Sequence, residues 1–103
     1  MTQDAQAPVT VPRLHEFKQQ GRKIVALTAY DFLFARLLDA SGVDLVLVGD
    51  SAAQVAAGRE STLPMTMEEA LYHCRMVRRG IRRALLVADM PFMSYQITPE
   101  EAL

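Results

Sequence analysis

Three short apolar runs alternate along this chain with segments of helical periodicity. The runs cover residues 24–29, 43–49 and 83–88 and are rich in Val, Leu and Ala. Their length and composition predict buried strands. Strands separated by helical patterns of about 10–15 residues predict right-handed βαβ units and a parallel sheet. The pattern therefore predicts an α/β protein.

The segments between the runs contain helix start and stop signals. The capping and terminating residues are Thr10 and Gly21, Asp31 and Gly42, Thr66 with Glu69 and Gly80, and finally Thr98. They predict four helices, the second over residues 32–41 with Phe34, Leu37 and Leu38 turned inward. Residues 52–64 lack such signals and are predicted to form a long loop, a length that is typical of functional loops.

The division of the chain follows from the same pattern. Residues 1–10 are small and polar and are predicted to form a flexible N-terminal arm, and residues 11–103 form the folded part. Both faces of a parallel sheet must be covered, and three strands with a last helix that starts at Thr98 do not achieve this. We therefore expect residues 11–103 to be the N-terminal part of a larger α/β domain.

Composition and charge exclude several functions. The net charge is −1, from 11 basic and 12 acidic residues, so neither a nucleic acid nor a membrane surface is an expected partner. The basic cluster is expected to solvate the end of a helix; it consists of Arg75, Arg78, Arg79, Arg82 and Arg83. One cysteine, Cys74, excludes an internal disulfide, and the sequence shows neither a signal peptide nor a membrane span. A cytoplasmic protein is the expectation.

Two acidic residues follow neighbouring strands. Asp50 comes after the second apolar run and Asp89 directly after the third, so both are expected at the carboxyl edge of the sheet. Two carboxylates in one small volume favour a shared proton or a cation, and hard oxygen ligands suit Mg²⁺. A 2-oxo acid could complete such a coordination shell. An Asp after a strand is also a common turn or capping residue, and both interpretations stay open.

The remaining polar residues near these strands have structural interpretations as well. Ser51 fits a helix cap and a ligand contact equally. Tyr30 and Asp31 lie where a helix must be capped. His73 has no second His or Cys at ligand spacing and is predicted to be a packed or surface residue. Cys74 lies on an apolar helix face and is predicted to be inert.

Several segments together resemble one known family. They are KIVALTAYD at residues 23–31, LVGDS at 47–51, STLPMT at 61–66, YH at 72–73, VRRG at 77–80 and ADMPFMSY at 88–95. In this order and spacing they resemble the ketopantoate hydroxymethyltransferase (3-methyl-2-oxobutanoate hydroxymethyltransferase) family, over about residues 11–103. The GDS and D-x-P-F-x-S-Y segments are specific in combination.

The resemblance implies a (β/α)₈ TIM barrel, of which this chain holds the first three βα units after a short N-terminal helix. It implies a homo-oligomeric, Mg²⁺-dependent enzyme of pantothenate and coenzyme A biosynthesis. Such an enzyme transfers a hydroxymethyl group from 5,10-methylenetetrahydrofolate to 3-methyl-2-oxobutanoate and forms 2-dehydropantoate. Asp50 and Asp89 match the family's metal-binding aspartates, and Asp50, Ser51 and Asp89 match the positions that hold the oxo acid.

The chain departs from the family pattern in two segments and in length. Ala52-Ala53-Gln54 stands where the family usually has Leu-Gly-Met, and Gly58-Arg59-Glu60 where it has Gly-x-Asp. A TIM barrel needs roughly 250 residues. The family's lysine and its remaining glutamates, including the catalytic base, would lie beyond Leu103. No catalytic residue is therefore assigned here, and the isolated chain is expected to be inactive.

Two other functions are compatible with these residues. A truncated barrel could act without catalysis, only by association through its exposed sheet edge. Asp89-Met90-Pro91 also resembles the phospho-acceptor loop of receiver domains in signalling proteins, although the spacing of Met and Pro differs from theirs.

Overall fold

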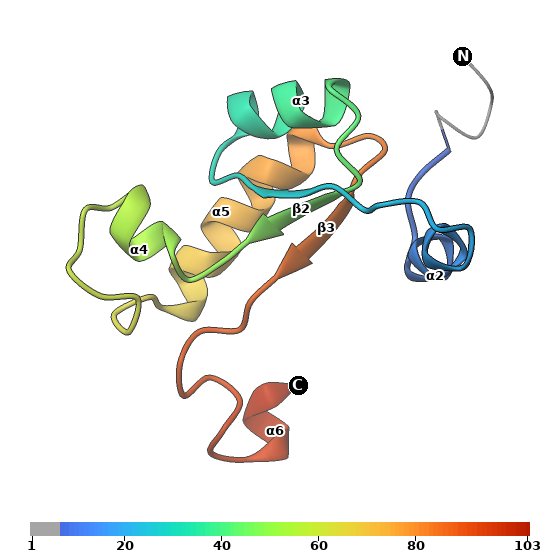
Figure 1. Ribbon diagram of the computed structural model, residues 1–103. Helices are drawn as coiled ribbons and strands as arrows, with labels where there is room; N and C mark the ends of the chain where they lie inside the picture. Colours follow the sequence, from blue (N-terminus) through green and yellow to red (C-terminus); the bar gives the residue numbers. More distant parts are fainter. Residues whose placement is uncertain (1–6) are drawn as a thin grey trace.

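The computed structural model describes residues 7–103 (Figure 1). Its helices are α2 (Val11–Gln19), α3 (Phe32–Ala40), α4 (Ala52–Val55), α5 (Met67–Gly80) and α6 (Pro99–Ala102), and its strands are β1 (Ala26–Thr28), β2 (Leu45–Val48) and β3 (Leu85–Ala88). Residues 1–6, most of the predicted flexible arm, lie outside the described residues. Within the rest of that arm Val9 is buried, and its N–H donates to the carbonyl oxygen of Arg83 at 2.7 Å.

The three strands of residues 7–103 form a parallel sheet in the order β1-β2-β3. The predicted α/β class and parallel sheet are confirmed. The strand order contradicts the receiver-like alternative, because flavodoxin-like folds place the first strand between the second and the third. None of the helices described here has the length and apolar content needed to cross a membrane.

The predicted helix caps are present. The side chains of Thr10, Asp31 and Thr66 accept hydrogen bonds from backbone N–H groups in the first turns of α2, α3 and α5. Thr66 and Glu69 form the reciprocal capping box. The prediction of a continuous loop over residues 52–64 was wrong at its start, where α4 forms one helical turn. Four residues are too few to produce a helical periodicity that a sequence pattern can reveal.

The core lies between the sheet and the pair α3 and α5 (Figure 1). Val46 and Val48 of β2 pack there against Ala35 of α3 and Val77 of α5. Helices α3 and α5 approach so closely that a Cβ on Gly80 would lie 2.8 Å from the carbonyl oxygen of Phe32. Gly80 is therefore required for helix packing.

This close approach overturns one predicted packing face. Phe34 and Leu37 were expected inward, but both are more than half exposed, and only Leu38 of the predicted set packs on the core. Small Ala35 takes the inward position because the short distance to α5 leaves no room for a large side chain.

Burial differs strongly between the strands. β2 is paired on both sides and buries Val46 and Val48, whereas every residue of β1 is exposed. The expectation of a buried first strand was therefore wrong for this chain, because β1 has a neighbour on one side only. The sheet face opposite α3 and α5 remains half-exposed; it consists of Leu45, Leu47, Leu85 and Val87 with the exposed Ala26 and Thr28.

Two carboxylates hold the amino end of the sheet. Asp44 is 1% exposed and accepts hydrogen bonds from the Val25 N–H at 3.0 Å, Arg22 at 3.1 Å and Arg83 at 3.0 Å. Burial alone would raise the pKa of Asp44, but these hydrogen bonds and the two guanidinium charges outweigh it and lower the pKa below 3.8. Asp44 lies within the second apolar run, and the hydrophobic pattern gave no indication of its role.

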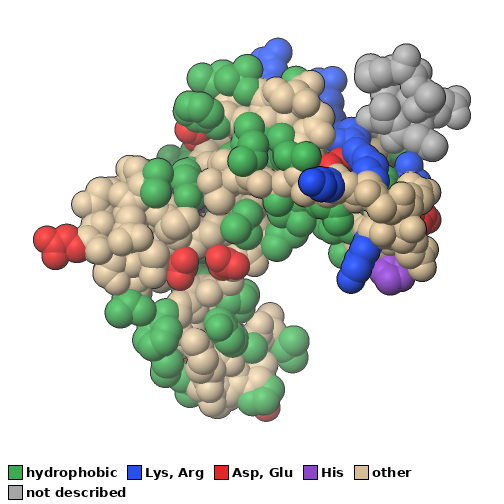
Figure 2. Space-filling view, viewed as in Figure 1, with side chains coloured by type: hydrophobic (Ala, Val, Ile, Leu, Met, Phe, Trp, Pro, Cys, Tyr) green, Lys and Arg blue, Asp and Glu red, His purple; other side chains and the backbone are tan. Residues whose placement is uncertain are grey.

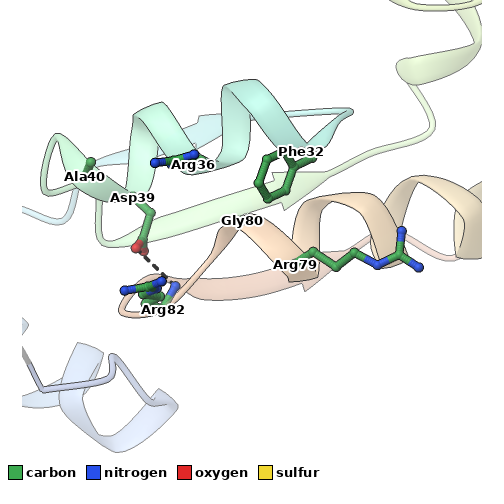
Figure 3. Close-up of a pocket in the computed structure, with 7 residues that line it drawn as sticks. All are labelled: Phe32, Arg36, Asp39, Ala40, Arg79, Gly80 and Arg82. Carbon is green, nitrogen blue, oxygen red and sulfur yellow. Dashed lines mark hydrogen bonds between the residues drawn. The ribbon is translucent and has the colours of Figure 1, made fainter.

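Asp39 plays a similar part at the turn between α5 and β3. Its carboxylate accepts from the backbone N–H groups of Arg82, Arg83 and Ala84 at 2.7–3.0 Å. Asp39 also borders a cavity of about 410 Å³ between α3 and α5. The Arg79 side chain lines the same cavity and points away from Asp39 (Figure 3). Asp39 thus connects the end of α3 to the start of β3.

Candidate functional site

The candidate site lies where β2 and β3 end. After Val48 the chain continues through Gly49 to Asp50, and after Ala88 it reaches Asp89. The Asp89 N–H donates to the Val48 carbonyl oxygen at 3.0 Å, so the parallel ladder extends as far as Asp89. The two predicted carboxylates consequently leave the sheet at the same edge.

Asp50 and Asp89 line one cavity of about 380 Å³. Its other lining residues are Ala88, Met90 and Tyr95. The space-filling view shows acidic side chains beside a hollow between the sheet and the C-terminal segment (Figure 2). The structure therefore brings together the two acids that the sequence pattern paired.

Gly49 lies close to both Asp89 and Ser51. A Cβ at Gly49 would lie 3.2 Å from Asp89 Oδ2 and 3.5 Å from Ser51 Oγ. Both oxygens thus border the same point above the buried Gly49 backbone. A side chain at this position would crowd both oxygens, so Gly49 allows Asp89 and Ser51 to lie close to the end of β2.

Ser51 occupies the capping position of α4 but does not cap it. Its side chain makes no hydrogen bond to the N–H groups of α4. Instead, Ser51 Oγ and the Tyr30 hydroxyl lie 2.7 Å apart. The capping interpretation of Ser51 is therefore not what the geometry shows, because its hydroxyl bonds to Tyr30.

His73 of α5 completes a chain of contacts to Ser51. Its Nδ1 lies 2.7 Å from the carbonyl oxygen of Tyr30, and its ring meets the Tyr30 ring edge-on at 6.3 Å. His73 was predicted to be a packed or surface residue, and its position is partly buried. The grouping of Ser51, Tyr30 and His73 was not predicted from the sequence. Its one available signal was that Tyr30 follows the first apolar run, as Asp50 and Asp89 follow the others.

The donor set suits a hard cation with few protein ligands. Residues 7–103 contain no group of three or more His, Cys, Asp or Glu side chains that could enclose a metal ion. Asp50 and Asp89 offer carboxylate oxygens at one cavity. Mg²⁺ fits such a site because it retains several waters and takes oxygen ligands from its substrate.

Cys74 does not belong to this site. It packs against the core between the helices and the sheet, and burial raises the pKa of its thiol. Its predicted inert role agrees with this environment.

Comparison with known proteins gives one consistent result. A family profile described as "Ketopantoate hydroxymethyltransferase" matches residues 8–103. Proteins named 3-methyl-2-oxobutanoate hydroxymethyltransferase are 55% identical in Synechococcus elongatus over 96 residues, and 57% identical in Syntrophotalea carbinolica over 93 residues. These alignments cover 93% and 90% of this chain but only 36% and 35% of the relatives. The chain thus spans about a third of the length of these curated relatives.

Proposed function

This chain belongs to the ketopantoate hydroxymethyltransferase family, and on that premise we propose that it supplies the Mg²⁺ and 2-oxo acid half of a hydroxymethyltransferase site. The reaction is the transfer of a hydroxymethyl group from 5,10-methylenetetrahydrofolate to 3-methyl-2-oxobutanoate, forming 2-dehydropantoate. The observation that supports it most is the placement of Asp50 and Asp89 on one cavity.

The fold that we propose for the whole enzyme is a (β/α)₈ barrel, with this chain as its first three βα units. Consecutive strands are neighbours in the order β1-β2-β3, and both crossover helices pack in one core on the same face of the sheet. Winding in one direction, with helices on one side only, is the arrangement of a barrel rather than of a doubly wound sheet. The half-exposed Leu45, Leu47, Leu85 and Val87 would then face the barrel interior.

Each residue of the site has a defined part in this proposal. Asp50 and Asp89 would hold Mg²⁺, and together with Ser51 they would hold the oxo acid. The bound ion would supply Lewis-acid polarisation of the oxo-acid carbonyl, which acidifies the C3 proton. Ser51 would orient the substrate through its hydroxyl.

We assign no general base to this chain. Abstraction of the C3 proton needs a carboxylate or imidazole within hydrogen-bond reach of C3. In this proposal the base, the folate site and the remaining ligands come from outside residues 1–103, and the enzyme works as a homo-oligomer in the cytoplasm. The 103-residue chain alone is accordingly proposed to be inactive.

A second function is favoured by the exposure of β1. Leu27 is 47% exposed and Val25 is 49% exposed, so this edge could pair with another chain. A non-catalytic role through association would follow if substitution of Asp50 and Asp89 left the activity unchanged. The same experiment separates the two functions.

The test uses a hybrid in which this chain, unaltered, replaces the matching segment of the Synechococcus elongatus relative. We expect formation of 2-dehydropantoate from the two substrates, with dependence on Mg²⁺. Loss of a direct metal ligand should cost more than the 10–100-fold typical of outer-shell partners, so Asp50→Asn and Asp89→Asn should each lower kcat/KM by about 100-fold or more. The matched control is Glu68→Gln, an exposed acid at the start of α5.

Two results would contradict the proposal. An unaltered hybrid that folds but forms no product would reject the transferase function of this segment. Retention of parental activity by both aspartate variants would reject the metal and substrate roles of these residues. Association of the isolated chain, measured by light scattering, would then support the second function.

A further inference from the structure

We propose that Tyr30 and His73 are positioning residues that orient the Ser51 hydroxyl toward the carboxylate of the 2-oxo acid. This inference rests on the proposed function and adds two residues to its substrate site. It is built on three contacts that join the end of β1, the end of β2 and the middle of α5.

The first contact determines where the Ser51 proton points. Tyr30 and Ser51 hydroxyl oxygens lie 2.7 Å apart, and one of them must donate. A phenolic O–H is a stronger hydrogen-bond donor than an alkyl O–H, so Tyr30 is the better donor. When Tyr30 donates to Ser51 Oγ, the Ser51 proton is free to be given to a ligand.

The second observation is the direction that remains for this proton. Ser51 makes no hydrogen bond to α4. Its Oγ and Asp89 Oδ2 lie 3.5 and 3.2 Å from the position that a Cβ of Gly49 would take, so the two side chains lie on the same side of Gly49. An anionic oxo acid entering beside Asp50 and Asp89 meets negative charge and needs a donor in addition to a cation. The Ser51 hydroxyl is a donor at this edge, and hydrogen bonds to charged groups are the stronger ones.

The third contact fixes Tyr30 itself. The ladder between β1 and β2 ends with the Ala29 N–H donating to the Leu47 carbonyl oxygen, so Tyr30 lies beyond it. The Tyr30 carbonyl accepts from His73 Nδ1 at 2.7 Å. The His73 ring is also held edge-on between the Tyr30 and Tyr72 rings. His73 thus places the Tyr30 backbone where the sheet no longer does.

The Tyr30 carbonyl oxygen also defines which ring nitrogen of His73 carries the hydrogen. A carbonyl oxygen can only accept, so Nδ1 must bear hydrogen and Nε2 is the bare nitrogen of the neutral ring. His73 acts here as a fixed support of the Tyr30 backbone.

The main test measures the KM for 3-methyl-2-oxobutanoate in the hybrid enzyme. Loss of one hydrogen bond corresponds to about a three- to tenfold loss of affinity. Tyr30→Phe should therefore raise KM by that factor with little change in kcat. His73→Leu should act in the same direction, and His73→Asn, which keeps a donor near the Nδ1 position, should restore most of the loss. The matched control is Glu68→Gln, an exposed acid at the start of α5 outside these contacts, and it should leave KM unchanged.

A double-mutant cycle separates positioning from general structure. Tyr30 acts through Ser51, so Tyr30→Phe should have no further effect on KM in a Ser51→Ala background. An equal rise of KM in both backgrounds, or no rise in either, would overturn the proposal. An unaltered hybrid without turnover would instead reject the proposed function, so the two failures are distinguishable.

A second measurement needs no variant and can therefore be made even if a variant fails to fold. Ring ¹⁵N spectra of the unaltered 103-residue chain report the tautomer of the neutral His73. The expected result is the Nδ1–H tautomer. The Nε2–H tautomer would overturn the role of His73.

Discussion

The buried carboxylate of Asp44 offers the sharpest test of how this fold is stabilised. Asp44 Oδ1 pairs with Arg22 and Arg83, and Oδ2 accepts from the Val25 N–H. Asp44→Asn preserves the shape but removes the charge and turns an amide group toward one of the donors. Hydrogen bonds to a charged group contribute about 1.5–3 kcal/mol, and breaking a buried ion pair costs about 3–5 kcal/mol.

The exposure of the two arginines decides how much stability Asp44→Asn loses. The Arg22 side chain is 43% exposed and keeps its hydration, so its pairing is largely screened. The Arg83 side chain is only 13% exposed and would retain a poorly solvated charge. We therefore expect Asp44→Asn to lower the free energy of unfolding by about 2–4 kcal/mol at neutral pH.

The same contacts predict the pH dependence. Because the pKa of Asp44 in the folded chain lies below 3.8, the folded state binds its proton less readily than the unfolded state. The stabilisation is then fully present above about pH 4 and is lost as pH falls through the folded pKa. The difference between the parent and Asp44→Asn should shrink in that acidic range, since Asn does not titrate.

Urea unfolding followed by circular dichroism measures both effects. The matched control is Glu16→Gln, which removes the ion pair between Glu16 and Arg13. The two charged groups lie 2.8 Å apart, and the Glu16 side chain is 52% exposed. Exposed pairs contribute about 0–1 kcal/mol, so this control should differ little from the parent. An Asp44→Asn variant as stable as the parent, or a stability difference that does not change with pH, would refute this account.

Two further predictions concern the packing of α5. Gly80→Ala should lower the free energy of unfolding by about 1–3 kcal/mol, because its Cβ would lie 2.8–2.9 Å from backbone atoms of Phe32 and Arg36. Urea unfolding checks this, and a more stable variant would contradict the close helix approach. Cys74 should react with a thiol reagent at neutral pH at least about tenfold more slowly in the folded chain than in urea, because burial raises its thiol pKa. Equal rates in the two states would show that the thiol is accessible.

Local signals accounted for most of the elements. The caps at Thr10, Asp31 and Thr66 act within three residues along the chain, so their chemistry could be read directly from the sequence. The strand that ends before Asp50 was also predicted from a local signal. Its apolar run is typical of a strand buried between two neighbours, and β2 is such a strand.

Which face of a helix is buried was less predictable. The pattern favoured Phe34 and Leu37 of α3, but the helix is so close to α5 that Ala35 faces the core. Interhelical distance depends on the small residues of both helices, here Gly80 and Ala35. A pattern within one helix does not contain that distance.

The sequence by itself determined the order of the elements, the family, and the position of Asp50 and Asp89 at the ends of their strands. Only the tertiary structure decided which side chains meet. Tyr30 and Ser51 are 21 residues apart in the chain, and Tyr30 and His73 are 43 apart. Asp44, hidden in an apolar run, likewise became recognisable only through Arg22 and Arg83. Contacts of this kind depend on strand register and helix packing, and neither follows from local propensity.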